Sequence, residues 1–110
     1  MNSRINPRHL LAERRRRDEH FPGMTEPAWF MLLGLVVAGE EARQLTVTEG
    51  MGFAFVPATS AHRHLTWLVE DGMVERTADP GDGRRYFLSL TAAGARKMAA
   101  YLQGGHERER

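Results

Sequence analysis

Cysteine is absent from the sequence, and its absence excludes three kinds of chemistry. A chain without thiols forms no disulfide framework, has no thiolate nucleophile and cannot bind zinc through cysteine. Such a composition is typical of proteins that work in a reducing compartment. We therefore expect the protein in the cytoplasm.

Long hydrophobic runs are also absent. The longest apolar stretch, PAWFMLLGLVVAG, contains thirteen residues from Pro27 to Gly39, whereas a helix that spans a bilayer needs about 20. The N-terminal segment lacks the apolar core of a signal peptide. We expect a soluble protein with no membrane partner, and the apolar stretch predicts a helix buried at the centre of the fold.

Enzyme motifs are missing as well. The five histidines show neither H-x-x-x-H nor H-E-x-x-H spacing. His62 and His64 would point about 200° apart on a helix, too far round it to share a metal ion. The sequence contains no glycine-rich phosphate loop and no G-x-S-x-G nucleophile motif. We predict no catalytic residues, no metal site, no cofactor and no enzymatic activity.

What is present is the composition of one small globular domain. The chain has 110 residues, of which 42% are hydrophobic and 26% charged, and its net charge is +1. These proportions allow a packed core but do not by themselves indicate a nucleic-acid partner. The first 20 residues hold six arginines and three acids. These arginines contact phosphate, solvate the outer face of a helix, or pair with the acids beside them.

Helix and strand signals follow one another in the order α-α-(β)-α-α-β-β-α. Threonines precede three of the predicted helices as N-caps, namely Thr25, Thr48 and Thr91. Gly72 is placed to end a helix over residues 58–71. We predict a single domain over residues 1–110. It begins with an N-terminal helix at residues 7–21 that takes part in dimerisation, followed by a winged helix-turn-helix core at residues 25–90. A C-terminal helix at residues 91–103 and a flexible tail at residues 104–110 complete it.

The helix predicted over residues 58–71 has an apolar stripe and an opposite side suited to DNA. The stripe consists of Ala61, Leu65, Leu68 and Val69 and faces the core. The rest of the surface carries short hydroxyl side chains, one arginine and one histidine, at Thr59, Ser60, His62, Arg63 and Thr66. Short side chains permit close approach to the major groove, and arginine can bond guanine through two hydrogen bonds. An ordinary surface helix is the alternative interpretation.

A hairpin follows this helix, with two arginines beside its turn. The stretch DPGDGRRYFLSL predicts two strands around a turn over residues 79–83. A short helix, a turn and a second helix form a helix-turn-helix, and a hairpin directly after it makes the motif a winged one. We therefore predict a mainly α fold with a small β-hairpin wing. Arg84 or Arg85 would reach the minor groove, and Asp79 or Asp82 would brace the arginine. The alternative is that these charges only keep the hairpin soluble.

The same residues resemble a known family. The stretch SAHRHLTWLVEDGMVERTADPGDGRRYFLSLTAAGARKM is similar to the recognition helix, wing and following helix of the MarR-type winged helix-turn-helix regulators. The shared pattern begins with the leucine spacing in the helix and continues with Gly72, a hydrophobic residue, Val74 and Arg76. It ends with the D-P-x-D-x-R-R turn and the L-x-L-T-x-x-G stretch. It covers residues 56–98 well and residues 25–55 more loosely.

The resemblance implies a homodimeric, sequence-specific transcription regulator that binds a pseudo-palindromic operator in double-stranded DNA and associates with the bacterial nucleoid. Carried over by position, it assigns DNA reading to the recognition-helix residues named above, the wing contacts to Arg84 and Arg85, and bracing to Asp82. Family members dimerise through long terminal helices, and this chain is a short form of that arrangement. Its candidate dimerisation residues are Leu10, Leu11, Met98, Tyr101 and Leu102. The resemblance leaves open whether a small-molecule effector binds.

A second interpretation keeps the fold but changes its use. The near-neutral net charge fits a winged helix that docks on a partner protein, or an accessory factor without an operator of its own. Trp67, which we place on the exposed flank of the helix over residues 58–71, would then be the apolar anchor. Salt separates the two interpretations, because arginine–phosphate contacts weaken steeply as salt rises and apolar contacts do not.

Overall fold

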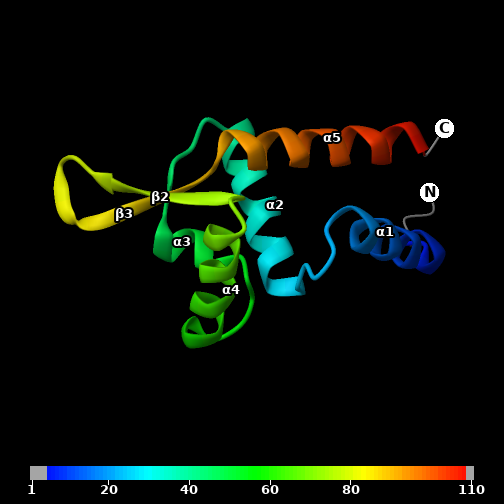
Figure 1. Ribbon diagram of the computed structural model, residues 1–110, viewed down its shortest axis with the longest axis horizontal. Coiled ribbons are helices and arrows are strands. Elements are labelled where there is room, and N and C mark those ends of the chain that lie inside the picture. The colour runs from blue at the N-terminus through cyan, green and yellow to red at the C-terminus, as the bar shows by residue number, and fades with distance from the viewer. Residues whose placement is uncertain (1–4, 109–110) are drawn as a thin grey trace.

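The computed structural model describes residues 5–108 and shows a helical body from which a long hairpin extends (Figure 1). In chain order the elements are α1 (Pro7–His20), α2 (Glu26–Glu40), β1 (Leu45–Thr46), α3 (Val47–Gly52), α4 (Ala58–Glu70), β2 (Val74–Asp79), β3 (Asp82–Leu90) and α5 (Ala92–Arg108). The predicted fold is confirmed, with α3 and α4 as the helix-turn-helix and β2 and β3 as the wing. No helix in this range is long and apolar enough to cross a membrane.

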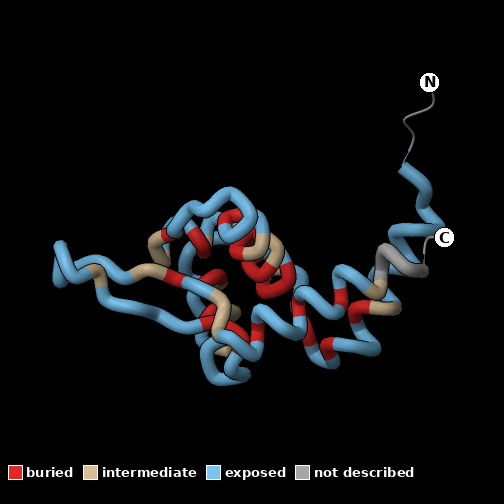
Figure 2. Tube along the Cα trace, turned by 90° about the horizontal axis from the view of Figure 1, so that it is seen from above, coloured by how far each residue is buried: buried red, intermediate tan, exposed pale blue. Residues whose placement is uncertain are grey.

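Helix α2 lies at the centre of the body. Thr25 caps it as predicted, because the Thr25 hydroxyl accepts a hydrogen bond from the Ala28 amide at 3.2 Å. Met31 and Leu32 are completely buried, and α3, α4 and β3 all pack against this helix. Figure 2 shows the buried residues gathered in the body, whereas the outer part of the wing is exposed. The apolar stretch is therefore the core helix that the sequence predicts.

Helix α3 begins earlier than predicted. Its N-cap is Thr46 and not Thr48: the Thr46 hydroxyl accepts from the Glu49 amide at 3.1 Å, and the Glu49 carboxylate accepts from the Thr46 amide at 2.9 Å. This reciprocal capping box satisfies two backbone amides that the helix leaves without partners. Gly50 of α3 lies so close to Leu88 that an added Cβ would come within 2.7 Å of the leucine side chain. The glycine that weakens the helix signal thus allows α3 to pack tightly on β3.

The strands β1, β3 and β2 form an antiparallel sheet in that order. Thr46 lies opposite Phe87, and Arg76 lies opposite Leu88. The turn of the wing is tighter than predicted, since β2 continues to Asp79 and β3 begins at Asp82. The Asp79 carboxylate accepts a hydrogen bond from the Gly81 amide at 2.8 Å, which closes the chain over two residues.

Arginines hold α1 to the rest of the chain. Arg17 is buried, pairs with Glu26 at the start of α2, and lies over the ring of Trp29 with 5.4 Å between the guanidinium carbon and the ring centroid. Arg16 donates a hydrogen bond to the backbone carbonyl of Tyr101 at 2.7 Å and lies 3.9 Å from the centre of the Tyr101 ring. Part of the arginine run is therefore an intramolecular anchor, a role that the sequence did not predict, whereas Arg14 pairs with the neighbouring Asp18 at 3.3 Å, as one of the alternatives predicts.

Helix α5 begins as predicted but continues further. The Thr91 hydroxyl accepts from the Gly94 amide at 2.9 Å and caps the helix. The helix runs to Arg108 instead of ending at residue 103, so residues 104–108 of the expected tail are helical. Residues 109–110 of that tail lie outside the described residues.

Two of the candidate dimerisation residues on α5 are part of the core. Met98 is fully buried and Tyr101 nearly so, within a single chain. The Tyr101 ring packs edge-on against Phe21 and Trp29, with centroids 5.5 and 5.3 Å apart. The assignment of Met98 and Tyr101 to a dimer surface is corrected accordingly, because their side chains already fill the space between α5, the α1–α2 connection and α2.

The capping box gives a prediction about stability. Thr46→Ala should lower the free energy of unfolding by about 1 kcal/mol, because the Glu49 amide loses its side-chain partner. Thr48→Ala is the matched control and should change it by less than about 0.5 kcal/mol, as expected for an exposed position without a capping role. Urea unfolding followed by circular dichroism measures both variants. Equal losses for the two variants would contradict the cap assignment.

Candidate nucleic-acid interface

Helix α4 places the predicted DNA-reading residues on its exposed side. Ala61, Leu65 and Leu68 are buried against the body, as predicted, whereas Val69 lies at the edge of the stripe and is 37% exposed. The candidate residues Thr59, His62, Arg63 and Thr66 are exposed, and Ser60 is half-buried. Pro57 precedes the helix and provides no side-chain cap. The first turn of α4 therefore presents the short hydroxyl side chains of Thr59 and Ser60, and His62 and Arg63 follow them on the exposed side.

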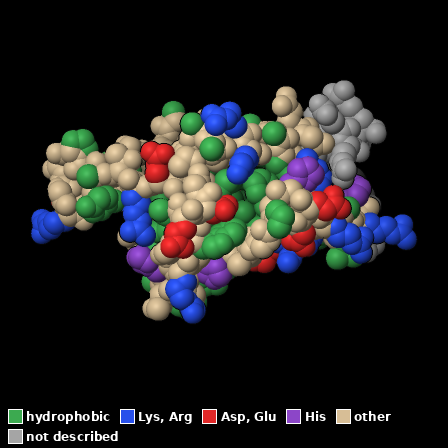
Figure 3. Space-filling view, viewed as in Figure 1, with side chains coloured by type: hydrophobic (Ala, Val, Ile, Leu, Met, Phe, Trp, Pro, Cys, Tyr) green, Lys and Arg blue, Asp and Glu red, His purple; other side chains and the backbone are tan. Residues whose placement is uncertain are grey.

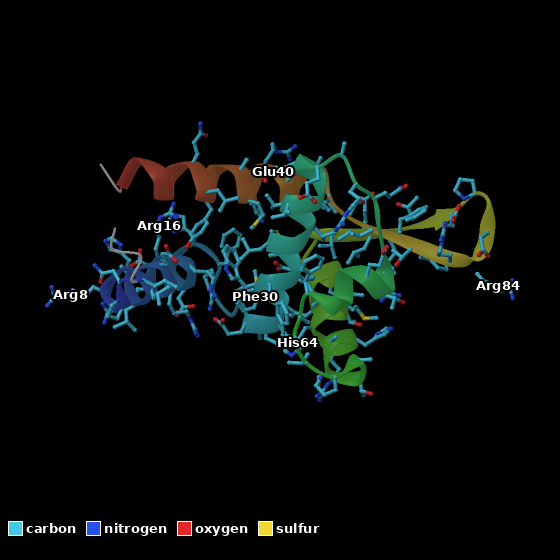
Figure 4. The ribbon with its side chains drawn as sticks, turned by 180° about the vertical axis from the view of Figure 1, so that it is seen from behind. Arg8, Arg16, Phe30, Glu40, His64 and Arg84 are labelled. Carbon is cyan, nitrogen blue, oxygen red and sulfur yellow. The ribbon has the colours of Figure 1, made fainter. Side chains whose placement is uncertain are left out.

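The two histidines of α4 have different environments. His62 is exposed, whereas His64 is half-buried and its Nδ1 lies 2.9 Å from the hydroxyl oxygen of Thr25 (Figure 4). This hydrogen bond joins α4 to the first residue before α2. It fixes the rotation of α4 about its own axis relative to the central helix. The sequence pattern predicts only a capping role for Thr25, and no local signal connects two residues that are 39 positions apart.

Trp67 is not the exposed anchor that the protein-docking interpretation requires. Its side chain is half-buried and packs against the hydrophobic core. The exposed aromatic residue near the helix-turn-helix is instead Phe55, in the turn between α3 and α4. Phe55 is 77% exposed, has a backbone φ of 57°, and meets the half-exposed ring of Phe30 edge-on at 5.7 Å. Periodicity misses this pair because Phe55 lies in a turn.

The two acids of the wing bind different partners. Asp79 braces Arg85, whose Nη2 and Nε lie 2.7 and 2.9 Å from the Asp79 Oδ2 atom. Asp82 accepts from the backbone amide of Arg84 at 3.0 Å, but the side chain of Arg84 approaches it only to 3.9 Å. The expected bracing of Arg84 by Asp82 is therefore weak, because Asp82 is engaged by the backbone of the turn. Arg84 is left 96% exposed at the end of the wing (Figure 4).

Local hydrogen bonds set the ionisation of two acids in this region. The Gly81 amide, together with the Arg85 guanidinium, lowers the pKa of Asp79 below its ordinary value. The amide and hydroxyl of Thr46 lower the pKa of Glu49, with a smaller contribution from the positive charges of Arg43 and Arg85. Both carboxylates are therefore ionised at neutral pH and occupied by partners of their own.

The wing and α4 form the two arms of an open angle. In Figure 1 the wing extends to one side of the body and α4 projects below it, with α3 at the corner between them. Helix α3 contacts both α4 and β3. The space-filling view shows Lys and Arg side chains at the end of the wing, at its base and at the lower end of α4 (Figure 3). The predicted contact residues of α4 and the wing thus border one concave surface.

The remaining candidate residues lie at the opposite end of the molecule. Leu10 and Leu11 on α1 are 54% and 57% exposed, and Leu102 on α5 is also exposed. Both helices extend away from the wing (Figure 1). In residues 5–104, no three histidine, aspartate or glutamate side chains gather in a way that could hold a metal ion.

Comparison with known proteins points to one family. A sequence model described as the MarR family matches residues 23–85, which is more than half of the chain. No curated protein sequence matches the chain. Among solved structures, a probable transcriptional regulator from Pseudomonas aeruginosa is similar with a TM-score of 0.66 and 24% identity, over 94% of this chain and 75% of the other.

Two further similar structures contain DNA. The S. aureus MepR–DNA complex has a TM-score of 0.76 and 19% identity, over 94% of this chain and 81% of MepR. A mutant of MarR from E. coli complexed with operator DNA has a TM-score of 0.65 and 23% identity, over 92% of this chain and 74% of the other. At these identities the similarity establishes the shared fold.

The bracing of the wing gives a prediction about pH. The pKa of Asp79, followed by NMR titration of its carboxyl carbon, should lie below the ordinary aspartate value of about 3.9. Because the folded state favours the ionised form, the stabilisation is present above that value and is lost as the pH falls through the lower pKa of the folded state. Arg85→Gln should raise the pKa only partly, since the Gly81 hydrogen bond is the larger cause. Arg84→Gln serves as the control, and an equal rise in both variants would show that Arg85 is not the specific partner.

Proposed function

Because the chain belongs to the MarR family, whose members are transcriptional regulators and not enzymes, we propose that it is a homodimer that regulates transcription by binding double-stranded DNA sequence-specifically. In this proposal α4 enters the major groove and the wing places Arg84 in the adjacent minor groove. The expectation that the protein is not an enzyme is confirmed by the family.

The observation that carries the proposal is that α4 and the wing border the same concave surface. Thr59, His62, Arg63 and Thr66 are exposed on α4, and Arg84 is almost fully exposed at the end of the wing. A major groove about 12 Å wide admits one helix, and an arginine suits the narrow, strongly negative minor groove. A protein with this arrangement can read bases with one arm and groove width with the other.

The distribution of charge along α4 supports the same orientation. Arg63 lies in the N-terminal half of the helix, whereas its one acidic residue, Glu70, is at the C-terminal end. The backbone amides of an N-terminal turn favour a phosphate, and an acid there would repel it. The N-terminal half of α4 is therefore the part proposed to enter the groove.

Dimerisation is proposed through the ends of α1 and α5. Leu10, Leu11 and Leu102 are exposed apolar side chains on these two helices. A twofold axis there would present two α4 helices to one side of a duplex, and half-sites about 34–36 Å apart would match that symmetry. The operator is accordingly proposed to be pseudo-palindromic. The cytoplasm, in association with the nucleoid, is the proposed location.

The deciding experiment is a salt titration of DNA binding, with the mass in solution measured by light scattering on the same sample. We expect a dimer that binds the promoter of its own gene more tightly than random duplex DNA. Its affinity should fall by about 10³-fold or more between 50 and 200 mM salt, if six or more phosphates are contacted. A monomer that ignores DNA at low salt would contradict the proposal and favour protein docking at the exposed Phe30–Phe55 pair.

Two arginine variants separate base reading from general attraction. Arg63→Ala should weaken binding by about 1–3 kcal/mol and relax the preference at one base pair of each half-site, if Arg63 reads guanine. Arg84→Ala should weaken binding to every sequence. It should also lower by about one the salt slope, which is the steepness with which the logarithm of the binding constant falls with the logarithm of the salt concentration. Arg96→Ala, on α5 and thus on the other side of the sheet from α3 and α4, is the control (Figure 1). Unchanged binding in both test variants would remove these two assignments.

A further inference from the structure

A hollow of about 190 Å³ lies at the corner between α3 and the wing. The polar side chains that line it are Thr46, Thr48, Arg76, Arg84, Arg85 and Tyr86. Thr46 and Thr48 come from the start of α3, and the other four come from β2 and β3. The sequence assigned none of these three a role in binding: Arg76 stands in the family pattern, Thr48 was expected as an N-cap, and Tyr86 was not named.

The charges around the hollow favour an anion. Three arginines line it, and its lining within the described residues includes no acid. Asp79 forms an ion pair with Arg85, and the ionised Glu49 carboxylate, which accepts from the Thr46 amide, does not line the hollow. Arg76 is exposed and forms no ion pair with any side chain among residues 5–104. Within that part of the chain, no acid neutralises the charge of Arg76.

The position of Arg76 follows from the sheet register. Arg76 lies opposite Leu88, and Leu88 is the side chain against which Gly50 of α3 packs. Alternation along β2 places Arg76 on the same face of the sheet as the buried Val74. Arg76 therefore points to the α3 side of the wing, which is the inner side of the angle between the wing and α4 (Figure 1).

This position has a consequence that rests on the proposed function. In a duplex, one sugar–phosphate strand separates a major groove from the adjacent minor groove. If α4 occupies the first groove and the end of the wing occupies the second, that strand must cross the corner between them. The corner is where α3 begins and where the hollow lies.

The geometry points to the hollow as the binding site for a phosphodiester group of this strand. Arg76 supplies the positive charge, and the hydroxyls of Thr48 and Tyr86 supply neutral hydrogen-bond donors. A phosphate contact of this kind fixes the register of the protein on the duplex without distinguishing bases. The bound phosphate would set how deeply α4 and the wing enter their grooves.

The first test compares Arg76→Gln with Arg96→Gln, on a short duplex that the wild-type protein selects from a randomised pool. Arg76→Gln should lower the salt slope by about one. Raising the salt from 50 to 200 mM should therefore weaken DNA binding by the variant roughly three- to fourfold less than it weakens binding by the wild type. The base preference should not change. Arg96→Gln should match the wild type. Circular dichroism and the unfolding midpoint check that both variants are folded.

The second test locates the phosphate and uses the wild-type protein as well as the variant. Single phosphates of the selected duplex are replaced in turn by neutral methylphosphonates. One replacement on the strand between the two grooves should weaken the wild type and leave Arg76→Gln unaffected, because the variant has already lost that contact. Equal weakening of both proteins, or no sensitive phosphate on that strand, would overturn the assignment while DNA binding itself stands. A wild-type protein that selects no duplex would overturn the proposed function and the site together.

Discussion

The packing of α3, α4 and β3 around the apolar helix α2 determines where every candidate DNA contact lies. Met31 and Leu32 have no exposed surface, because α3, α4 and β3 cover the side of α2 on which they lie. Helix α4 is held on one side by Leu65 and Leu68, and the hydrogen bond between Thr25 and His64 fixes its rotation. The sheet is held on another side by Leu88. Since interiors are close-packed, a change in α2 would shift both arms of the concave surface.

The sequence was most informative where the signals are local. The periodicity of Leu65 and Leu68 predicted α4, the run from Pro27 to Gly39 predicted the core helix, and the glycine- and proline-rich turn predicted the wing. These features depend on contacts within a helix or between neighbouring strands. The fold class follows from their order along the chain, which is why it was predicted in full.

Contacts between distant residues were not predictable in the same way. The N-cap of α3 is Thr46 and not the predicted Thr48, because the pairing of β1 with β3, which no local pattern shows, ends at Thr46 and the helix begins there. Arg16 and Arg17 look like part of a solvated charge run, but α5 and α2 supply a carbonyl and a carboxylate for them. Trp67 was expected on the surface because helical periodicity does not show that neighbouring elements cover that flank. Arg76 belongs to the family pattern, but the pattern assigns it no role, because only the sheet register places it beside α3.

Thr46 belongs to two elements at once. It pairs with Phe87 of the wing strand through β1, and it caps α3 through its hydroxyl and its amide. The base of the hairpin and the start of the helix-turn-helix are therefore joined through one residue with no flexible linker between them. The base of the wing cannot tilt about Thr46 on its own. If it bends toward or away from a duplex, it must either move α3 with it or break the hydrogen bonds of the cap. Mechanically, the wing is an extension of the helix-turn-helix and not an independent arm.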